Sequence, residues 1–249
     1  MKLQLPFDPE FLKSFSENSK YMFSAAQKAV EIAQIALNEY FRSIKKIPES
    51  TKILAENGWY LPFDFHPVVV NRMASHLKEG DCKIVDNEMI NFLDKELSNI
   101  QEQLNKKFPK RRSVINAGIR AHKKQEYYLS IPIFFTQIEG MCNDLTGSRF
   151  FKTTKKHPQT EEWVMKFEKD TIIRALLEPL SFTGPMRQPQ DIDNPIGINR
   201  HDVLHGNSVD YGESKINGYK VLSLLNYIGD TVFKAERSLE QKGSQKMEE

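Results

Sequence analysis

The stretch from Gly197 to Gly212 gathers residue types that carry out acid–base and phosphate chemistry in proteins. It reads GINRHDVLHGNSVDYG and holds Arg200, His201 and His205. Arginine grips a phosphate through paired hydrogen bonds, and imidazole takes up and releases protons near neutral pH. Arginine can stabilise charge on phosphate oxygens while histidine moves a proton, so these groups are the minimum needed to cleave RNA through its own 2′-hydroxyl.

Two other interpretations of this stretch stay open. The first is structural: a polar helical turn that ends at Gly206 as its C-cap. The second is a metal site, because His201 and His205 are four residues apart and share one helix face. No HExxH pattern and no obvious third ligand accompany these histidines. The phosphate interpretation has its own constraint, since Arg200 and His205 lie roughly 140° apart around a regular helix. They converge only if the first turn is irregular or the site lies at the helix start.

The segment NRHDVLHG resembles the motif of the HEPN superfamily, in which an arginine, a polar residue, a short spacer and a histidine follow one another. The resemblance covers residues 110 to 240 and is similar in character to members from prophages and abortive-infection systems. It implies a HEPN-type all-α helical bundle, here with an additional N-terminal helical region. It also implies a homodimer with a composite site that cuts RNA without a metal and leaves a 2′,3′-cyclic phosphate. Carried over by position, Arg200 and His205 are the catalytic pair and His201 is the polar position.

The expected function is therefore that of a metal-independent endoribonuclease, acting as a bacterial toxin or an anti-phage defence effector. Its expected partner is RNA, with an antitoxin or regulatory partner as a further expectation, and no cofactor or metal is expected. Some members of the superfamily have lost catalysis, so a catalytically silent binding or scaffold module is the alternative. A histidine-ligated metal hydrolase is the second alternative.

Three further residues are candidates for lining the site. Asn199 and Tyr211 flank the motif. Glu139 lies on an otherwise apolar segment, and a buried carboxylate needs a partner. We expect Glu139 to lie beside the site and orient Arg200 or a histidine, unless its segment is only a solvent-exposed helix edge.

Clusters of basic residues are candidates for RNA binding. Such clusters hold phosphates if they flank a cleft and are otherwise solvated faces. The candidates are Lys106, Lys107, Lys110, Arg111, Arg112, Lys155 and Lys156.

Apolar periodicity predicts the helices that position these residues. Helices are expected over 8–46, with Pro48 ending the segment, over 86–108, over 111–147 as one or two helices, and from residue 160 to 180. Residues 53–67 read as a loop, and 68–80 as either helix or strand. Pro132 is expected to kink or divide the segment 111–147. A proline-containing connection precedes the motif, and a long helix over 214–241 follows it. No convincing strand pattern occurs, so the predicted fold class is all-α.

The predicted organisation is an N-terminal helical region over 1–109, a HEPN-like bundle over 110–241 and a disordered tail over 242–249. The net charge of +2 is too small to indicate a nucleic-acid partner by itself. Cys82 and Cys142 lack metal-ligand spacing, which favours a reduced, cytoplasmic setting. No signal peptide is expected, and the longest apolar run, IPIFF, is too short to span a membrane.

Overall fold

The computed structural model describes residues 8–154, 157–169, 171–187 and 197–248. Helices account for most of these residues. The strands among them are β1 (Thr153–Thr154) and β2 (His157–Pro158), which pair antiparallel. The predicted all-α fold class is therefore confirmed. In the part of the chain that the structure describes, no helix is both long and apolar enough to cross a lipid bilayer.

The chain divides into two units, residues 1–45 and 46–249. Helix α1 (Pro9–Glu56) begins in the first and ends in the second. The prediction that Pro48 ends this helix is wrong. A proline removes one helical N–H and crowds the carbonyl four residues earlier. However, Ile47, Leu54 and Ala55 are at most 1% exposed, so tertiary packing around this turn offsets the cost of the proline.

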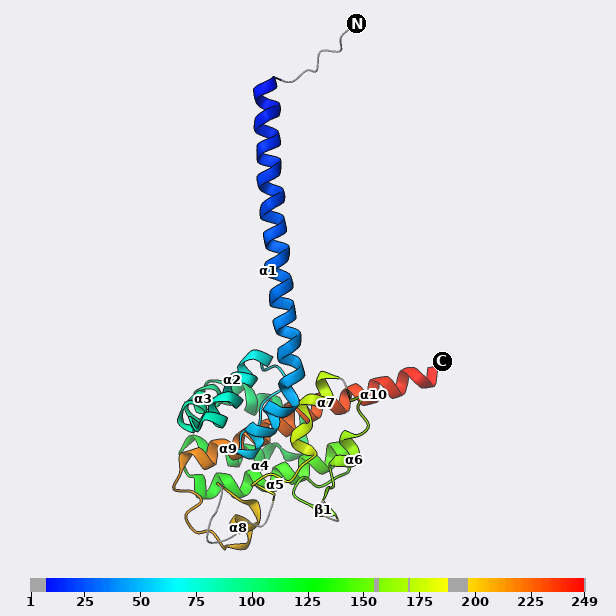
Figure 1. The fold of residues 1–249 in the computed structure, drawn as a ribbon. Coiled ribbons are helices and arrows are strands. Elements are labelled where there is room, and N and C mark those ends of the chain that lie inside the picture. The colour runs from blue at the N-terminus through cyan, green and yellow to red at the C-terminus, as the bar shows by residue number, and fades with distance from the viewer. Residues whose placement is uncertain (1–7, 155–156, 170, 188–196, 249) are drawn as a thin grey trace. The chain divides into compact units, whose positions relative to one another are not determined.

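Helices make up most of the second unit, and the segment left open between helix and strand is helical. Helix α5 packs against α4 and α9, and α9 also packs against α3 (Figure 1). The elements after α1 are, in chain order, α2 (Pro67–Glu79), α3 (Cys82–Lys107), η1 (Pro109–Arg111), α4 (Arg112–Lys123), α5 (Tyr127–Thr146), β1, β2, α6 (Glu161–Val164), α7 (Ile172–Leu176), η2 (Glu178–Leu180), α8 (Arg200–His205), α9 (Lys215–Tyr227), η3 (Ile228–Val232) and α10 (Phe233–Glu248).

Several boundaries differ from the sequence-based expectation. Because α3 packs against both α4 and α9, one apolar core runs across residue 109, where a domain boundary was expected. The single helix expected from residue 160 is divided into α6, α7 and η2. Helix α10 continues to Glu248, through residues that were expected to form a disordered tail.

Pro132 lies inside α5 and does not divide it. The break falls earlier, between α4 and α5, where Gln125 adopts a φ of 62°. Because Pro132 has no N–H, the carbonyl of Tyr128, four residues before it, receives no helical hydrogen bond. This free carbonyl becomes important beside the motif.

The final helix contains a π-helical segment, η3, between α9 and α10. Gly229 in this segment lies against α3, since a Cβ atom at this position would lie 2.2 Å from Cδ2 of Leu104. The next residue, Asp230, has a side chain that is 17% exposed. A π-helical segment adds one residue to a helical turn. Such segments occur often at functional sites.

Candidate functional site

Helix α8 carries the motif and is fixed at both ends by its own sequence. Asn199 is the N-cap, and its Oδ1 accepts hydrogen bonds from the backbone N–H of His201 at 2.8 Å and of Asp202 at 3.3 Å. Gly206 ends the helix in the left-handed conformation, with φ of 77°. The expected C-cap is therefore confirmed. Gly206 is suited to this position because residues with a Cβ atom rarely adopt such a φ.

A second contact of Asn199 ties the start of α8 to the first part of the proline-containing connection. Its Nδ2 donates to the carbonyl of Pro185 at 2.7 Å, and the N–H of Arg200 donates to the carbonyl of Met186 at 3.2 Å. Asn199 is buried. The sequence placed Asn199 among the site-lining residues, and in the structure it positions the helix that carries the motif.

Replacing Asn199 with alanine is expected to lower the free energy of unfolding by about 2 kcal/mol, because a helix cap and a buried hydrogen bond are lost together. Asn199→Ser keeps a capping oxygen but loses the donor to Pro185, so a smaller loss is expected. Urea unfolding of the three proteins measures both effects. An alanine variant as stable as the wild type would contradict the capping role.

The two histidines of the motif lie together on the exposed side of α8. Val203 is buried, and α8 packs against α5. His201 and His205 are both exposed, and their ring centroids are 4.3 Å apart with the ring planes inclined by 48°. The spacing of four residues therefore brings two imidazoles to one place at the surface.

Arg200 points to a different neighbour. Its guanidinium carbon lies 5.7 Å from the ring centroid of Phe151, and its Nε atom is buried without a hydrogen-bond partner. Among the described residues, no hydrogen bond or ring contact joins Arg200 to His205. Since α8 is helical from its first residue, the irregular first turn that would bring the pair together does not occur.

Glu139 is linked to Arg200 through one shared neighbour. Its Oε2 accepts a hydrogen bond from the backbone N–H of Phe151 at 2.9 Å, and the ring of Phe151 lies near the Arg200 guanidinium. In the described part of the chain, Glu139 forms no ion pair with Arg200 or with a histidine. Glu139 therefore lies near the motif, where its carboxylate accepts a hydrogen bond from the backbone.

Tyr211 fastens the loop after α8 to the start of α5. Its hydroxyl donates to the carbonyl of Tyr128 at 2.9 Å, which is the carbonyl that Pro132 leaves without a helical partner. The two tyrosine rings also meet edge to face, with centroids 5.2 Å apart. Gly212 fits beneath the ring of Tyr128, because a Cβ atom there would lie 2.5 Å from Cγ. Tyr211 thus has a structural partner close to the motif.

The sequence interpretation missed Arg187, which lies beside the anchor of α8. Arg187 is 6% exposed, and its guanidinium carbon lies 3.7 Å from the ring centroid of Phe150. The guanidinium donates to the carbonyls of Leu180 at 3.4 Å and Phe182 at 3.1 Å, and to Oγ1 of Thr160 at 3.4 Å. Burial lowers the pKa of this group. Nothing in the sequence GPMRQP distinguishes Arg187 from a surface arginine.

The predicted RNA-binding cations have different environments. Lys106, Lys110 and Arg112 are exposed. Arg111 pairs with Asp144, with 2.8 Å between Nη2 and Oδ2. Lys155 and Lys156 lie outside the described residues.

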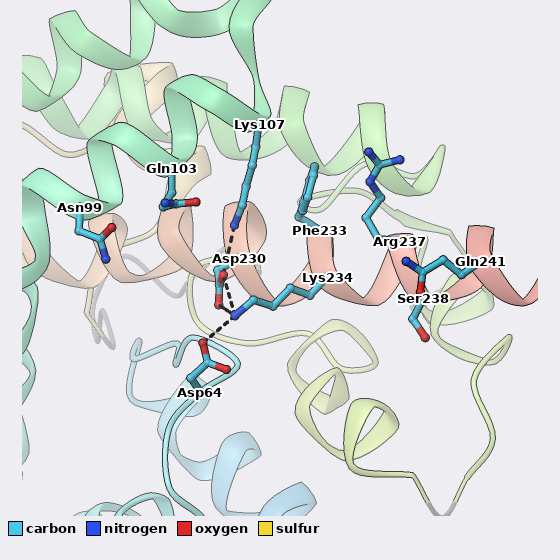
Figure 2. A pocket seen from close by; sticks show the side chains of 10 residues that line it. All are labelled: Asp64, Asn99, Gln103, Lys107, Asp230, Phe233, Lys234, Arg237, Ser238 and Gln241. Carbon is cyan, nitrogen blue, oxygen red and sulfur yellow. Dashed lines mark hydrogen bonds and ion pairs between the residues drawn. The ribbon is translucent and has the colours of Figure 1, made fainter.

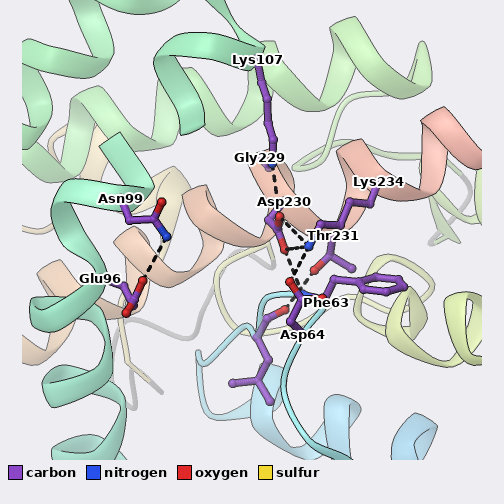
Figure 3. A network of polar contacts seen from close by, with 10 residues as sticks. Phe63, Asp64, Glu96, Asn99, Lys107, Gly229, Asp230, Thr231 and Lys234 are labelled. Carbon is purple, nitrogen blue, oxygen red and sulfur yellow. Dashed lines mark hydrogen bonds and ion pairs between the residues drawn. The ribbon is translucent and has the colours of Figure 1, made fainter. Parts of the chain in front are cut away.

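Lys107 belongs to a polar network around the π-helical segment. Its Nζ atom donates to the carbonyl of Gly229 at 3.1 Å and to Oδ1 of Asp230 at 3.2 Å (Figure 3). Lys234 joins Asp230 to Asp64, and Asp230 also accepts from the backbone N–H of Phe63. The side chain of Lys107 is only 14% exposed. Its charge is therefore directed at a carboxylate of the same chain.

A cavity of about 460 Å³ opens beside this network. Figure 2 shows Lys107 and Lys234 converging on Asp230, with Phe233 and Arg237 further along α10. Its lining residues come from α3, from η3 and α10, and from the loop before α2. No residue of α8 lines it. The cavity and the motif are thus separate features of the second unit.

Potential metal ligands group elsewhere. Among the described residues, His76, Glu79 and Asp81 offer ligand atoms within 4.8 Å of one another, while the α8 histidines have no third ligand within that range. All three lie at the C-terminal end of α2 or just after it, and Glu79 and Asp81 are exposed.

Comparisons with protein-family models, with curated proteins and with solved structures found no match for this chain.

Proposed function

We propose that the protein is a HEPN-like endoribonuclease that cleaves RNA without a metal through attack by the 2′-hydroxyl. The observation that carries the proposal is the presentation of the motif on α8. Arg200 occupies the first helical position, and His201 and His205 stand side by side at the surface, 4.3 Å apart. A guanidinium and two exposed imidazoles from one short helix suit a phosphodiester substrate better than a buried small molecule.

In the proposed reaction, His205 accepts the proton of the 2′-hydroxyl while the 2′-oxygen forms a bond to phosphorus. The bond from phosphorus to the 5′-oxygen breaks, and that oxygen takes a proton from a protonated imidazole or from water. The products are a 2′,3′-cyclic phosphate and a free 5′-hydroxyl. Arg200 stabilises the negative charge on the non-bridging oxygens, and His201 positions His205.

The separation of Arg200 from His205 bears on how this site is completed. Within one copy, the arginine lies beside Phe151 and the histidines face outward. We therefore propose that the RNA is held between two copies of the motif, so that arginine and histidine act on one phosphate from different subunits. A toxin or anti-phage effector of the cytoplasm, controlled by an antitoxin or regulator, is the proposed biological role.

A catalytically silent HEPN-like binding module is the second candidate. The observation that favours it is the placement of Arg200, whose Nε atom is buried and whose guanidinium lies beside an aromatic ring. In that case the motif positions α8 and takes no part in chemistry. The metal hydrolase is less favoured, because the α8 histidines lack a third ligand among the described residues.

An RNA cleavage assay in EDTA separates these candidates. Wild-type protein is expected to cut RNA to products that end in cyclic phosphate. His205→Ala is expected to cut at least about 100-fold more slowly, since a positioned acid–base group contributes a factor of that order. His157→Ala is the matched control, because His157 is an exposed histidine outside the motif and is expected to leave the rate unchanged.

Equal rates for the wild type and His205→Ala would contradict the assignment of His205. Cleavage that requires an added metal would favour the hydrolase. A wild type that binds RNA but never cuts it would favour the silent module.

A further inference from the structure

Helix α1 exposes an unusual amount of apolar surface in the first unit. Its residues 21–41 include only three charged side chains, Lys28, Glu31 and Glu39. The large apolar side chains that are exposed there are Tyr21, Met22, Phe23, Val30, Ile32, Ile35, Leu37, Tyr40 and Phe41. A helix that is apolar on most of its surface is normally covered by other protein. The question is which partner covers this one.

The spacing of the apolar residues answers part of this question. Steps of three and four residues alternate without interruption through one set of positions, here called the α1 seam. The seam consists of Phe23, Ala26, Val30, Ala33, Leu37, Tyr40 and Ile44. Such a repeat, sustained over three heptads on one continuous helix (Figure 1), is the pattern by which helices pair in coiled coils.

The charged residues indicate which helix is the partner. Lys28, Glu31, Glu39 and Arg42 all occupy outer heptad positions, away from the seam. The positions that flank the seam are Met22, Gln27, Ala29, Gln34, Ala36, Phe41 and Ser43, and none of them is charged. Coiled coils that select a different partner use complementary charges at these flanking positions. With none present, a second copy of the same helix meets no like-charge repulsion.

The small residues of α1 and the apolar area that it can bury also favour a second copy of the same helix as the partner. Four alanines, Ala26, Ala29, Ala33 and Ala36, lie on or beside the seam and let two helices approach closely. Six exposed large apolar side chains lie on or beside the seam: Met22, Phe23, Val30, Leu37, Tyr40 and Phe41. If each buries roughly 100 Å², two copies together bury about 1,200 Å² of apolar surface. That value reaches the lower end of the range for stable protein interfaces.

We propose that two copies of this chain pair through the α1 seam. This inference rests on residues of α1 alone and requires no ribonuclease activity. Its readout is mass, whereas the readout of the proposed function is RNA cleavage. Loss of cleavage would leave this proposal standing. A monomeric wild type would overturn this proposal and the two-copy arrangement of the RNA site, but not cleavage by the motif itself.

The test is light scattering of the full-length chain across a dilution series. The wild type is expected to have twice the monomer mass of 28.9 kDa. Val30→Glu/Leu37→Glu places two carboxylates in the seam and is expected to weaken self-association at least tenfold and yield monomer. Ser24→Glu/Asn38→Glu adds the same two charges at outer positions and is expected to remain dimeric.

Two outcomes would overturn the proposal. One is a wild type that is monomeric at every concentration, which means that the seam is covered by this chain itself or by another protein. The other is a seam variant that dimerises as strongly as the outer-position variant. Because Val30 and Leu37 lie in the first unit, the thermal transition of the second unit serves as the folding control and is expected to be the same in all three proteins.

Discussion

Replacing Arg187 with alanine is expected to lower the free energy of unfolding of the second unit by about 3–5 kcal/mol. The reason is that three effects coincide at this side chain. The Phe182 carbonyl and the Thr160 hydroxyl lose the guanidinium as donor, and the Leu180 carbonyl keeps only its bond from Thr160. The ring of Phe150 loses the cation over its face, and a buried volume is left empty. Urea unfolding of wild type and variant measures the loss.

Two further variants separate hydrogen bonding from packing at this position. Arg187→Met fills much of the volume without donors, so its cost is expected to lie below that of alanine. Arg187→Lys keeps the charge but lacks the planar fork of the guanidinium, so it is also expected to destabilise. If the lysine variant were as stable as the wild type, the positive charge alone would be what position 187 requires. The same loss is expected to loosen α8, whose start is bonded to Pro185 and Met186.

The stability of the second unit is expected to fall by about 3 kcal/mol between pH 7 and pH 4 on account of His122 alone. His122 is 2% exposed, and neither ring nitrogen has a hydrogen-bond partner. The rings of Tyr127, Phe134 and Tyr219 surround it. Desolvation lowers its pKa to about 4, against the smaller opposing effect of Asp94.

The sign follows from comparing the folded and unfolded chains. In the unfolded chain the pKa of a histidine is about 6.5. Between pH 6.5 and about pH 4, His122 binds a proton in the unfolded chain but stays neutral in the folded chain. Acidification therefore favours unfolding, beginning near pH 6.5 and ending near pH 4.

A pH series of urea unfolding curves tests this expectation. His122→Phe removes the titrating ring but keeps an aromatic side chain, so its stability is expected to fall less steeply than that of the wild type. His157→Gln is the matched control, because His157 is exposed and its replacement is expected to keep the wild-type slope. Parallel curves for the wild type and His122→Phe would show that His122 does not titrate in this way.

Most helices could be predicted from the sequence, because an apolar stripe facing a core repeats at the helical period. Prolines were the main source of error. Pro48 was expected to end a helix and Pro132 to kink or divide one, but both lie inside continuous helices. In each case the proline removes a hydrogen bond within its own helix, while the contacts that offset this loss involve the tertiary structure. Pro132 is the clearer example, since the carbonyl that it frees is taken up by Tyr211.

The motif was visible in the sequence because it is defined by residue types within six positions of one another. The C-cap at Gly206 was visible for the same reason. The roles of Asn199 and Glu139 were not, since their partners are backbone atoms of Pro185 and Phe151. Arg187 carried no signal at all. Its importance comes from burial among carbonyls, which a single sequence does not encode in any local pattern.

The π-helical segment has a consequence for changes in chain length. Elsewhere in a helix, removing one residue turns everything beyond it by about 100° and takes the apolar stripe away from the core. Segment η3 already holds one residue more than a regular helical turn, so removing one there restores ordinary winding. Helices α9 and α10 would then keep their faces toward the core, and the loss would fall on the Asp230 network. Asp230 is the residue of η3 that is not buried, so its deletion is the one expected to leave the core side chains of the final helix in place.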